Sequence, residues 1–467
     1  MSNKHPNASS PSEKLLGPSV KIAKKIATQI MRFKKMSDKE LLAHFNGSRF
    51  SSLCSLKTPA VELFYGRDGS RFFLDLARIL ILYAPELKQK INLDKVVVAV
   101  KNSYSNQFII DGKPIEKETI KDMFDSAIKD IKSGFKKCMH YIPCVLFIHP
   151  SPDDFSVGPV KFVRTSALLS QTFPMEWHSQ GDDISLEQRS LNYYKEYPWV
   201  ACVEVESCDF DVSFEVAVFA CTTALNAIRV CFGSDATKLI RLSTEASGEL
   251  RSARVWASPD GKFECSHSSI FKSPYGPLNW YEYLNEQDGG RIKSFLGDVI
   301  HQVCALDNFS ELSGRLIDAV NWFGDACLER SPAASIVKYV TAIERLYMAS
   351  KDFGVKERFI NRVSKILSDF ELSASDIARQ DALKVYNLRS TLVHGGTSPR
   401  AGEEILPKAE AEQLARGCIL CSEQLYRVIF NTFDPKTPAE LEEAMKTYET
   451  EGLQWCIDKA EQRHRRA

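Results

Sequence analysis

The feature that most constrains this 467-residue chain is its C-terminal third, where every segment with a clear apolar period is helical. From Gly290 onward, apolar residues recur at spacings of three and four, which is the stripe of an amphipathic helix. Ser331-Pro332 offers a cap and a first-turn proline to a helix from Ala333 to Ala349. The pattern therefore predicts an all-α region, and we place its boundary between residues 285 and 310.

One helix of this region has a clearly marked end. Its apolar stripe consists of Val385, Leu388 and Leu392. The residues that can cap its start lie upstream, in Ser373-Ala-Ser-Asp376. Gly395-Gly396 accepts left-handed backbone conformations, and Pro399 forbids continuation of the helix. We therefore expect His394 to lie in the last turn.

Arg389 and His394 are the two chemically capable side chains of this helix. A helix turns about 100° per residue, so the two lie roughly 140° apart around the axis and about 7.5 Å apart along it. One helix does not easily aim both at the same phosphate, but two copies packed about a two-fold axis could bring both residues of each chain into one cleft. The pair suits a metal-free device for RNA transesterification, in which His394 moves protons and Arg389 stabilises charge on phosphorus. The spacing by itself favours the alternative, an exposed arginine and a histidine that caps the helix.

The segment 386–395, together with the upstream helix 340–347, resembles the Apea-like branch of the HEPN superfamily, many of whose members are ribonucleases in bacterial anti-phage defence. The resemblance covers roughly the last third of the chain. It implies an α-helical bundle that dimerises through its motif helices and cuts RNA without a metal. It further implies an abortive-infection setting, with a phage component as the trigger and cellular RNA as the target.

The family's motif is an Arg, a polar residue directly after it, and a His that closes the helix. These fall on Arg389, Ser390 and His394. The acidic residue of the upstream helix corresponds to Glu344, and its role, structural or catalytic, stays open. We expect no cofactor and no metal. A non-catalytic HEPN-like dimerisation or RNA-binding scaffold is the alternative function.

The region before residue 285 is mixed. It predicts helices at Lys14–Lys35, Phe72–Tyr83, Lys117–Lys137 and Val212–Val230, and strands at Lys95–Val100, Tyr141–His149, Gly158–Arg164 and Trp199–Glu206. A hairpin of 250–257 with 262–265 is expected around Asp260-Gly261. The fold class is therefore α+β, with a disordered start and basic helix in 1–36, an α/β sensor or regulatory region in 37–300, and a HEPN-like helical ribonuclease domain in 301–467.

Lys+Arg and Asp+Glu both total 60, so no global charge draws the chain toward nucleic acid, and RNA binding requires a local patch. The basic helix of residues 14–35 could be an RNA-binding arm or a membrane-surface helix, but packing with a solvated lysine face is favoured. Thirteen cysteines without a disulfide framework or a signal peptide indicate the reducing cytoplasm. The apolar runs are too short to cross a bilayer, so no membrane partner is expected.

Three groups of residues contain potential metal ligands, but their spacing favours a role in packing, turns or strands over metal binding. Cys418 and Cys421 belong to a helical core stripe. The spacing of Cys138, His140, Cys144 and His149 matches no common zinc pattern. The acidic residues of 152–154 and 204–206 faintly resemble a metal-dependent nuclease core, which is a further alternative, but the usual Glu-x-Lys is missing.

Overall fold

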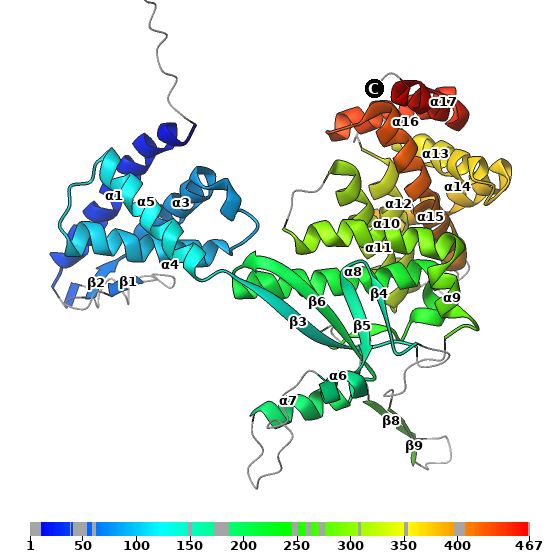
Figure 1. The fold of residues 1–467 in the computed structure, drawn as a ribbon, viewed down its shortest axis with the longest axis horizontal. Coiled ribbons are helices and arrows are strands. Elements are labelled where there is room, and N and C mark those ends of the chain that lie inside the picture. The colour runs from blue at the N-terminus through cyan, green and yellow to red at the C-terminus, as the bar shows by residue number, and fades with distance from the viewer. Residues whose placement is uncertain are drawn as a thin grey trace, which may run out of the picture. The chain divides into compact units, whose positions relative to one another are not determined.

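This computed structural model describes residues 11–37, 39–40, 54–57, 62–147, 152–171, 186–244, 251–257, 263–269, 276–306, 310–349, 354–396 and 407–465. The chain divides into two compact units, one of Met1–Cys138 with Val205–Glu215 and one of Met139–Glu204 with Val216–Ala467. Figure 1 labels most of their helices and strands. Mixed elements precede a wholly helical C-terminal part, so the predicted α+β class is confirmed.

The first unit is mostly helical. Its elements are α1 (Pro11–Lys34), β1 (Cys54–Lys57), β2 (Glu62–Tyr65), α3 (Arg67–Tyr83), the short 3-10 turn η1 (Pro85–Leu87), α4 (Leu93–Tyr104), the π-helical segment η2 (Ser105–Ile110) and α5 (Lys117–Ser133). Strands β1 and β2 pair antiparallel. The apolar faces of the four long helices meet in one core, which includes Ile26 of α1, Phe73 of α3, Val96 of α4 and Phe124 of α5. The helices predicted at 14–35 and 72–83 are confirmed.

The strand predicted at Lys95–Val100 is wrong, because this segment belongs to helix α4. The run of valines favours a strand by local propensity, since β-branched side chains suit a pleated surface. In the structure, however, Val96, Ala99 and Val100 are buried while Val98 is 54% exposed. That three-and-four spacing is helical, and packing in the core of the first unit overrides the local preference.

The sheet has the strand order β4-β5-β6-β3-β7. Its strands are β3 (Lys136–Val145), β4 (Asp154–Val157), β5 (Val160–Arg164), β6 (Trp199–Cys208) and β7 (Arg241–Leu242). In the antiparallel β4–β5 hairpin, Phe155 is opposite Phe162. The turn carries Gly158 at φ +57°, where a Cβ atom would lie 2.5 Å from the backbone of Gly297 in α10, so a side chain is excluded on both counts.

The predicted strands at 199–206 and 158–164 are confirmed as β6 and β5. Two boundaries were wrong: helix α5 stops at Ser133, before Gly134, and β3 already begins at Lys136. The hairpin of β8 (Arg251–Ala257) with β9 (Phe263–Ser269) is confirmed, and its turn lies outside the described residues. Most of the predicted disordered start also lies outside the described residues.

Helix α8 (Phe210–Thr237) contains the predicted apolar helix and passes through a break at Gly233, where φ is +77°. By length and composition alone it is long and apolar enough to cross a membrane, but 72% of its most apolar window is buried inside the protein. At the break, the N–H of Ser234 donates to the carboxylate of Glu412 over 2.6 Å, and Arg416 Nε donates to the carbonyl of Val230 over 2.7 Å. A carboxylate and a guanidinium from one turn of α15 thus satisfy the backbone groups that the break leaves open.

The second unit also contains the helices α6 (Thr165–Gln171), α7 (Leu186–Lys195), α9 (Trp280–Asn285), α10 (Gln287–Cys304), α11 (Glu311–Leu328), α12 (Pro332–Tyr347), α13 (Val355–Asp369), α14 (Ser375–Val393), α15 (Pro407–Phe433), α16 (Pro438–Glu451) and α17 (Leu453–His464). All described elements after Gly290 are helical, as predicted. Ser331 caps α12 by accepting from the N–H of Ala334 over 3.3 Å. The change to wholly helical content, where we expected a domain boundary, falls inside this unit.

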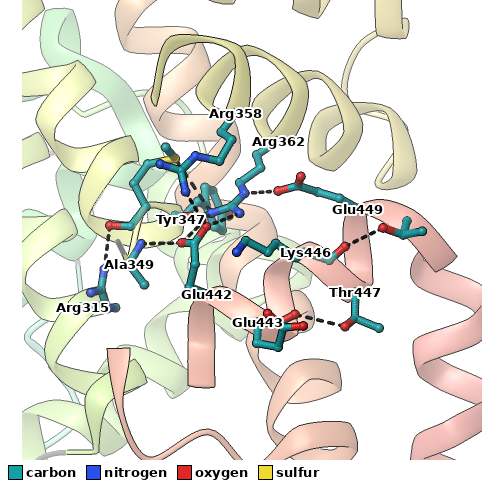
Figure 2. A network of polar contacts seen from close by, with 12 residues as sticks. Arg315, Tyr347, Ala349, Arg358, Arg362, Glu442, Glu443, Lys446, Thr447 and Glu449 are labelled. Carbon is teal, nitrogen blue, oxygen red and sulfur yellow. Dashed lines mark hydrogen bonds and ion pairs between the residues drawn. The ribbon is translucent and has the colours of Figure 1, made fainter. Parts of the chain in front are cut away.

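Helices α13 and α16 are joined by a buried polar network (Figure 2). Glu442 accepts hydrogen bonds from Arg362 over 2.7 and 3.1 Å, from Arg358 over 2.9 Å and from the N–H of Ala349 over 3.1 Å. Arg362 also donates to Glu449 and to the carbonyl of Tyr347. The side chain of Arg362 is fully buried and that of Glu442 is 5% exposed. Both charges are therefore kept away from water and compensated inside the protein.

Candidate active site

The end of α14 lies where the sequence predicted it. The helix runs to Val393, and His394 is its capping residue, whose backbone N–H donates to the carbonyl of Ser390 over 3.0 Å. Gly395 follows with φ of +73°, the left-handed conformation that glycine adopts without strain. Pro399 lies outside the described residues.

Arg389 lies on the buried side of α14 and pairs with Glu344 of α12. Its Nη2 donates to Oε2 of Glu344 over 3.0 Å, and the two side chains are 23% and 19% exposed. Arg389 follows Ala378, Ala382 and Val385 by eleven, seven and four residues, which is the spacing of one helix face. Those three residues are buried. Two of the four predicted site residues, Arg389 and Glu344, are therefore brought together.

The Arg389–Glu344 pair is electrostatically incomplete. Burial raises the pKa of the Glu344 carboxyl, and the charge and hydrogen bond of Arg389 offset only part of that effect. Arg389 Nε is buried and has no hydrogen-bond partner among the described residues. Since a guanidinium has five N–H donors and Glu344 accepts from one nitrogen, Arg389 keeps donors available for a second anion.

Ser390 and His394 lie on a different side of the helix from Arg389. A separation of four residues places these two on adjacent turns of one face. His394 is exposed and Ser390 is partly exposed. The structure does not bring His394 to the Arg389–Glu344 pair within one chain, in agreement with the roughly 140° separation expected from helix geometry. The imidazole is accessible to solvent and hence to a ligand.

Tyr386 has a role that the sequence reasoning missed. Its ring centroid is 5.9 Å from the guanidinium carbon of Arg389 and 5.0 Å from the ring centroid of Phe359 in α13. Only 9% of Tyr386 is exposed, and burial raises the pKa of its hydroxyl. The ring thus supports the guanidinium from the preceding turn. The sequence signal for this contact is that Tyr386 precedes Arg389 by three residues, a spacing that makes side chains neighbours on a helix.

Several residues of the candidate metal groups have other surroundings or partners in the structure. Cys418 and Cys421 are buried in α15, as predicted. Asp154 forms an ion pair with Lys161, and Glu206 forms one with Lys137. Within the residues that the structure describes, no group of three His, Cys, Asp or Glu side chains is close enough to hold a metal ion. His149 lies outside those residues.

Comparison with known proteins adds no relative. The chain matches no protein family model, no curated protein and no solved structure. The geometry at the end of α14 and the sequence motif are therefore the observations on which a functional proposal has to stand.

Proposed function

We propose that this protein is a metal-independent endoribonuclease of an anti-phage defence system that acts as a homodimer and is regulated by its N-terminal region. The observation that carries the proposal is the end of α14, where an exposed imidazole lies little more than one turn beyond an anchored guanidinium. The resemblance of 386–395 to the HEPN motif supports the substrate class. It also supports the setting, with a phage component as trigger and cellular RNA as target.

His394 supplies the proton transfers. The imidazole of one copy takes the proton of a ribose 2′-hydroxyl while the 2′-oxygen bonds to phosphorus. The imidazolium of the other copy gives a proton to the 5′-oxygen as the P–O5′ bond breaks. The products are a 2′,3′-cyclic phosphate and a free 5′-hydroxyl, so the protons taken and given balance. Ser390 is the polar neighbour of this imidazole on the same face.

Arg389 stabilises the negative charge that builds on the phosphoryl oxygens. Its planar, cationic fork matches two such oxygens. The hydrogen bond to Glu344 fixes the position of the guanidinium before substrate arrives, which is the condition for strong electrostatic catalysis. Glu344 is in this proposal a positioning residue.

A second copy completes the site. Within one chain the two functional side chains leave α14 in different directions, so a single α14 does not surround a phosphodiester. A two-fold axis near the end of the helix places the same residues of both chains around one cleft. The proposal therefore requires a homodimer for activity.

The direct test is His394→Ala, measured as cleavage of total RNA in buffer with a chelator. We expect cleavage to fall by about 10²-fold or more, because a positioned acid/base group contributes about that much. The matched control is His301→Ala, since His301 is also exposed and also lies in the last turn of a bundle helix, α10. Fragments from the wild type should end in 2′,3′-cyclic phosphate. Full activity of His394→Ala would end the catalytic claim.

One observation favours the alternative, a non-catalytic dimerisation or RNA-binding scaffold. Arg389 already has a carboxylate partner within its own chain, as structural arginines do. The two functions separate when RNA binding and cleavage are measured on the same variants. Loss of cleavage with retained binding in His394→Ala supports the enzyme, whereas wild-type protein that binds RNA and never cuts it supports the scaffold. Cleavage that stops on addition of chelator would instead support the metal-dependent nuclease.

A further inference from the structure

The outer face of α1 carries a dense line of positive charge. Between Lys14 and Lys35 the chain has seven basic residues and no acidic one: Lys14, Lys21, Lys24, Lys25, Arg32, Lys34 and Lys35. All seven are exposed. At about 100° per residue, all except Lys34 fall within a stripe of roughly 100° on the helix surface. The stripe runs for about 31 Å along the axis, given a rise of 1.5 Å per residue.

The opposite face of α1 is fixed in the core of the first unit. Ala23 and Ile26 are fully buried, and Phe33 is 4% exposed. Tyr104 of α4 donates a hydrogen bond to the carbonyl of Ala23 over 3.1 Å, which ties α1 to α4. The sequence interpretation of a packed helix with a solvated lysine face is therefore confirmed, and the charged stripe is held on a rigid support.

The stripe is not neutralised within the described part of the chain. No ion pair there joins Lys21, Lys24, Lys25 or Arg32 to a carboxylate. Lys25 instead lies with Nζ 5.5 Å from the ring centroid of Phe72 in α3. Because the whole chain has equal numbers of basic and acidic residues, 60 of each, this is a local concentration of charge rather than a property of the composition. A ligand that matches this line of positive charge is an extended polyanion.

Two kinds of polyanion could match this charge, an anionic membrane surface and a nucleic acid, and the burial of the apolar face of α1 favours the nucleic acid. An amphipathic helix binds a membrane surface by inserting its apolar side chains among the lipids. In α1 those side chains are committed to the core, and Met31, 54% exposed, is the only large apolar side chain at its exposed surface among those described. A nucleic-acid backbone needs no apolar insertion, since phosphates are bound by lysine and arginine at the surface.

We infer that the outer face of α1 is a binding surface for the phosphodiester backbone of a nucleic acid, with Lys21, Lys25 and Arg32 among its cations. That the nucleic acid is RNA rests on the proposed function. We expect the surface to respond to charge rather than to base sequence, because phosphate contacts from surface lysine and arginine carry no direct sequence information. It would hold substrate by long-range attraction and leave the choice of cleavage site to other residues.

The test is the binding of a fluorescent 20-nucleotide oligouridylate to the full chain, in a His394→Ala background so that no cleavage occurs. The test variant carries Lys21→Gln, Lys25→Gln and Arg32→Gln. The matched control carries Lys117→Gln, Lys121→Gln and Lys129→Gln, which removes the same charge from exposed positions of α5 in the same unit. On α5, unlike α1, the lysines alternate with acidic residues such as Glu118, Asp122 and Asp130.

Each phosphate contact on a single strand contributes about 0.7 to the slope of log binding constant against log salt. Removal of three contacts should therefore lower the slope by about 2 and weaken binding up to about 100-fold near 0.1 M salt. The α5 control should bind within about two-fold of its parent, because mixed-sign surfaces attract polyanions weakly. Circular dichroism and thermal unfolding of both variants should match the parent.

Equal binding by the α1 and α5 variants would overturn the inference, as would the absence of RNA binding by the parent. A third arm uses vesicles of phosphatidylserine and phosphatidylcholine. Loss of vesicle binding in the α1 variant without loss of RNA binding would also overturn it and assign the face to lipid. The readout is binding and not cleavage, so failure of His394→Ala to abolish cleavage would sink the proposed function and leave this result standing.

Discussion

Arg362 and Arg389 each pair with a glutamate from a neighbouring helix of the same bundle, but the two pairs differ in how fully their polar groups are used. Glu442 accepts from three residues, and its partner Arg362 also donates to Glu449 and a backbone carbonyl. Within the described part of the chain, Glu344 accepts one side-chain hydrogen bond, from Arg389, whose Nε is buried without a partner there. In the first pair both partners make several hydrogen bonds, whereas in the second pair Arg389 keeps N–H donors that could bind another group.

The ionisation of the two carboxyls shows the same contrast. Burial disfavours the charged form of Glu442, but the hydrogen bonds and charges of Arg362 and Arg358 more than offset this, so the pKa of Glu442 is below its ordinary value. For Glu344, burial outweighs the single arginine, and the pKa is above its ordinary value. A pair whose hydrogen bonds are satisfied suits a structural role, whereas a buried carboxyl with a raised pKa is more frequent at functional sites.

The sharpest test of the Arg362–Glu442 pair is Arg362→Ala. Removal of this guanidinium leaves Glu442 buried without its main counter-charge, so we expect the free energy of unfolding to fall by about 3–5 kcal/mol. Urea denaturation measures it. The matched control is Arg379→Ala, because the pair of Arg379 with Glu357 also joins two bundle helices but its side chains are 51% and 66% exposed. Solvent screening should make the control nearly neutral. Equal losses of stability in the two variants would show that the buried Arg362–Glu442 pair stabilises the fold no more than an exposed ion pair does.

Arg389→Ala should show the opposite profile. We expect RNA cleavage to fall by about 10²-fold, the scale for removal of one oxyanion-stabilising donor group. Stability should fall less than in Arg362→Ala, because Glu344 is partly exposed and can take up a proton once its partner is gone. Arg389→Lys keeps the charge but not the planar fork, so it should recover stability better than activity. If Arg389→Ala were fully active but strongly destabilised, the Arg389–Glu344 pair would have a structural role, as the Arg362–Glu442 pair does.

The helical half of the fold could be predicted from sequence because its signals are local. Ser331-Pro332 begins α12 and Gly395 ends α14, and both act through backbone geometry that no distant contact overrides. The valine run in α4 could not be read in the same way. Its local preference is for a strand, and only the core of the first unit, which takes up Val96 and Val100, makes it a helix.

The place of the candidate residues on α14 could be predicted from the sequence, but their contacts could not. The spacing of Arg389 and His394 correctly gave two separate faces. The motif paired Glu344 with this helix by analogy, but the hydrogen bond between them needs the packing of α12 on α14, which a sequence does not display. The network around Glu442 was missed altogether. Its members come from α13, α16 and the segment after α12, so no short motif contains them.

The dependence of stability on pH should separate the two carboxyls by its sign. For Glu442, with a lowered pKa, the stabilisation is present above the unfolded-state pKa and is lost as the pH falls through the folded-state pKa. For Glu344, with a raised pKa, stability is greatest below the unfolded-state pKa and falls as the pH rises through the folded-state pKa. Both effects should amount to a few kcal/mol at most, since one pKa unit corresponds to about 1.4 kcal/mol.

The measurement compares Glu442→Gln and Glu344→Gln with the wild type by urea denaturation between about pH 3 and pH 7, a range that spans ordinary carboxyl pKa values. Relative to the wild type, Glu442→Gln should lose stability as the pH rises, whereas Glu344→Gln should gain it. Slopes of the same sign would contradict the contrast between the pairs.

The smallest effect is expected at Ser390, the polar residue that lies between Arg389 and His394 in the sequence. Ser390→Ala should lower RNA cleavage by less than about 10-fold, because a neutral hydrogen bond contributes only about 0.5–1.5 kcal/mol. Stability should be unchanged, since the side chain is partly exposed and serine is no better than alanine inside a helix. A loss as large as that of His394→Ala would show instead that Ser390 contacts the reacting atoms, and the division of roles at the end of α14 would have to include it.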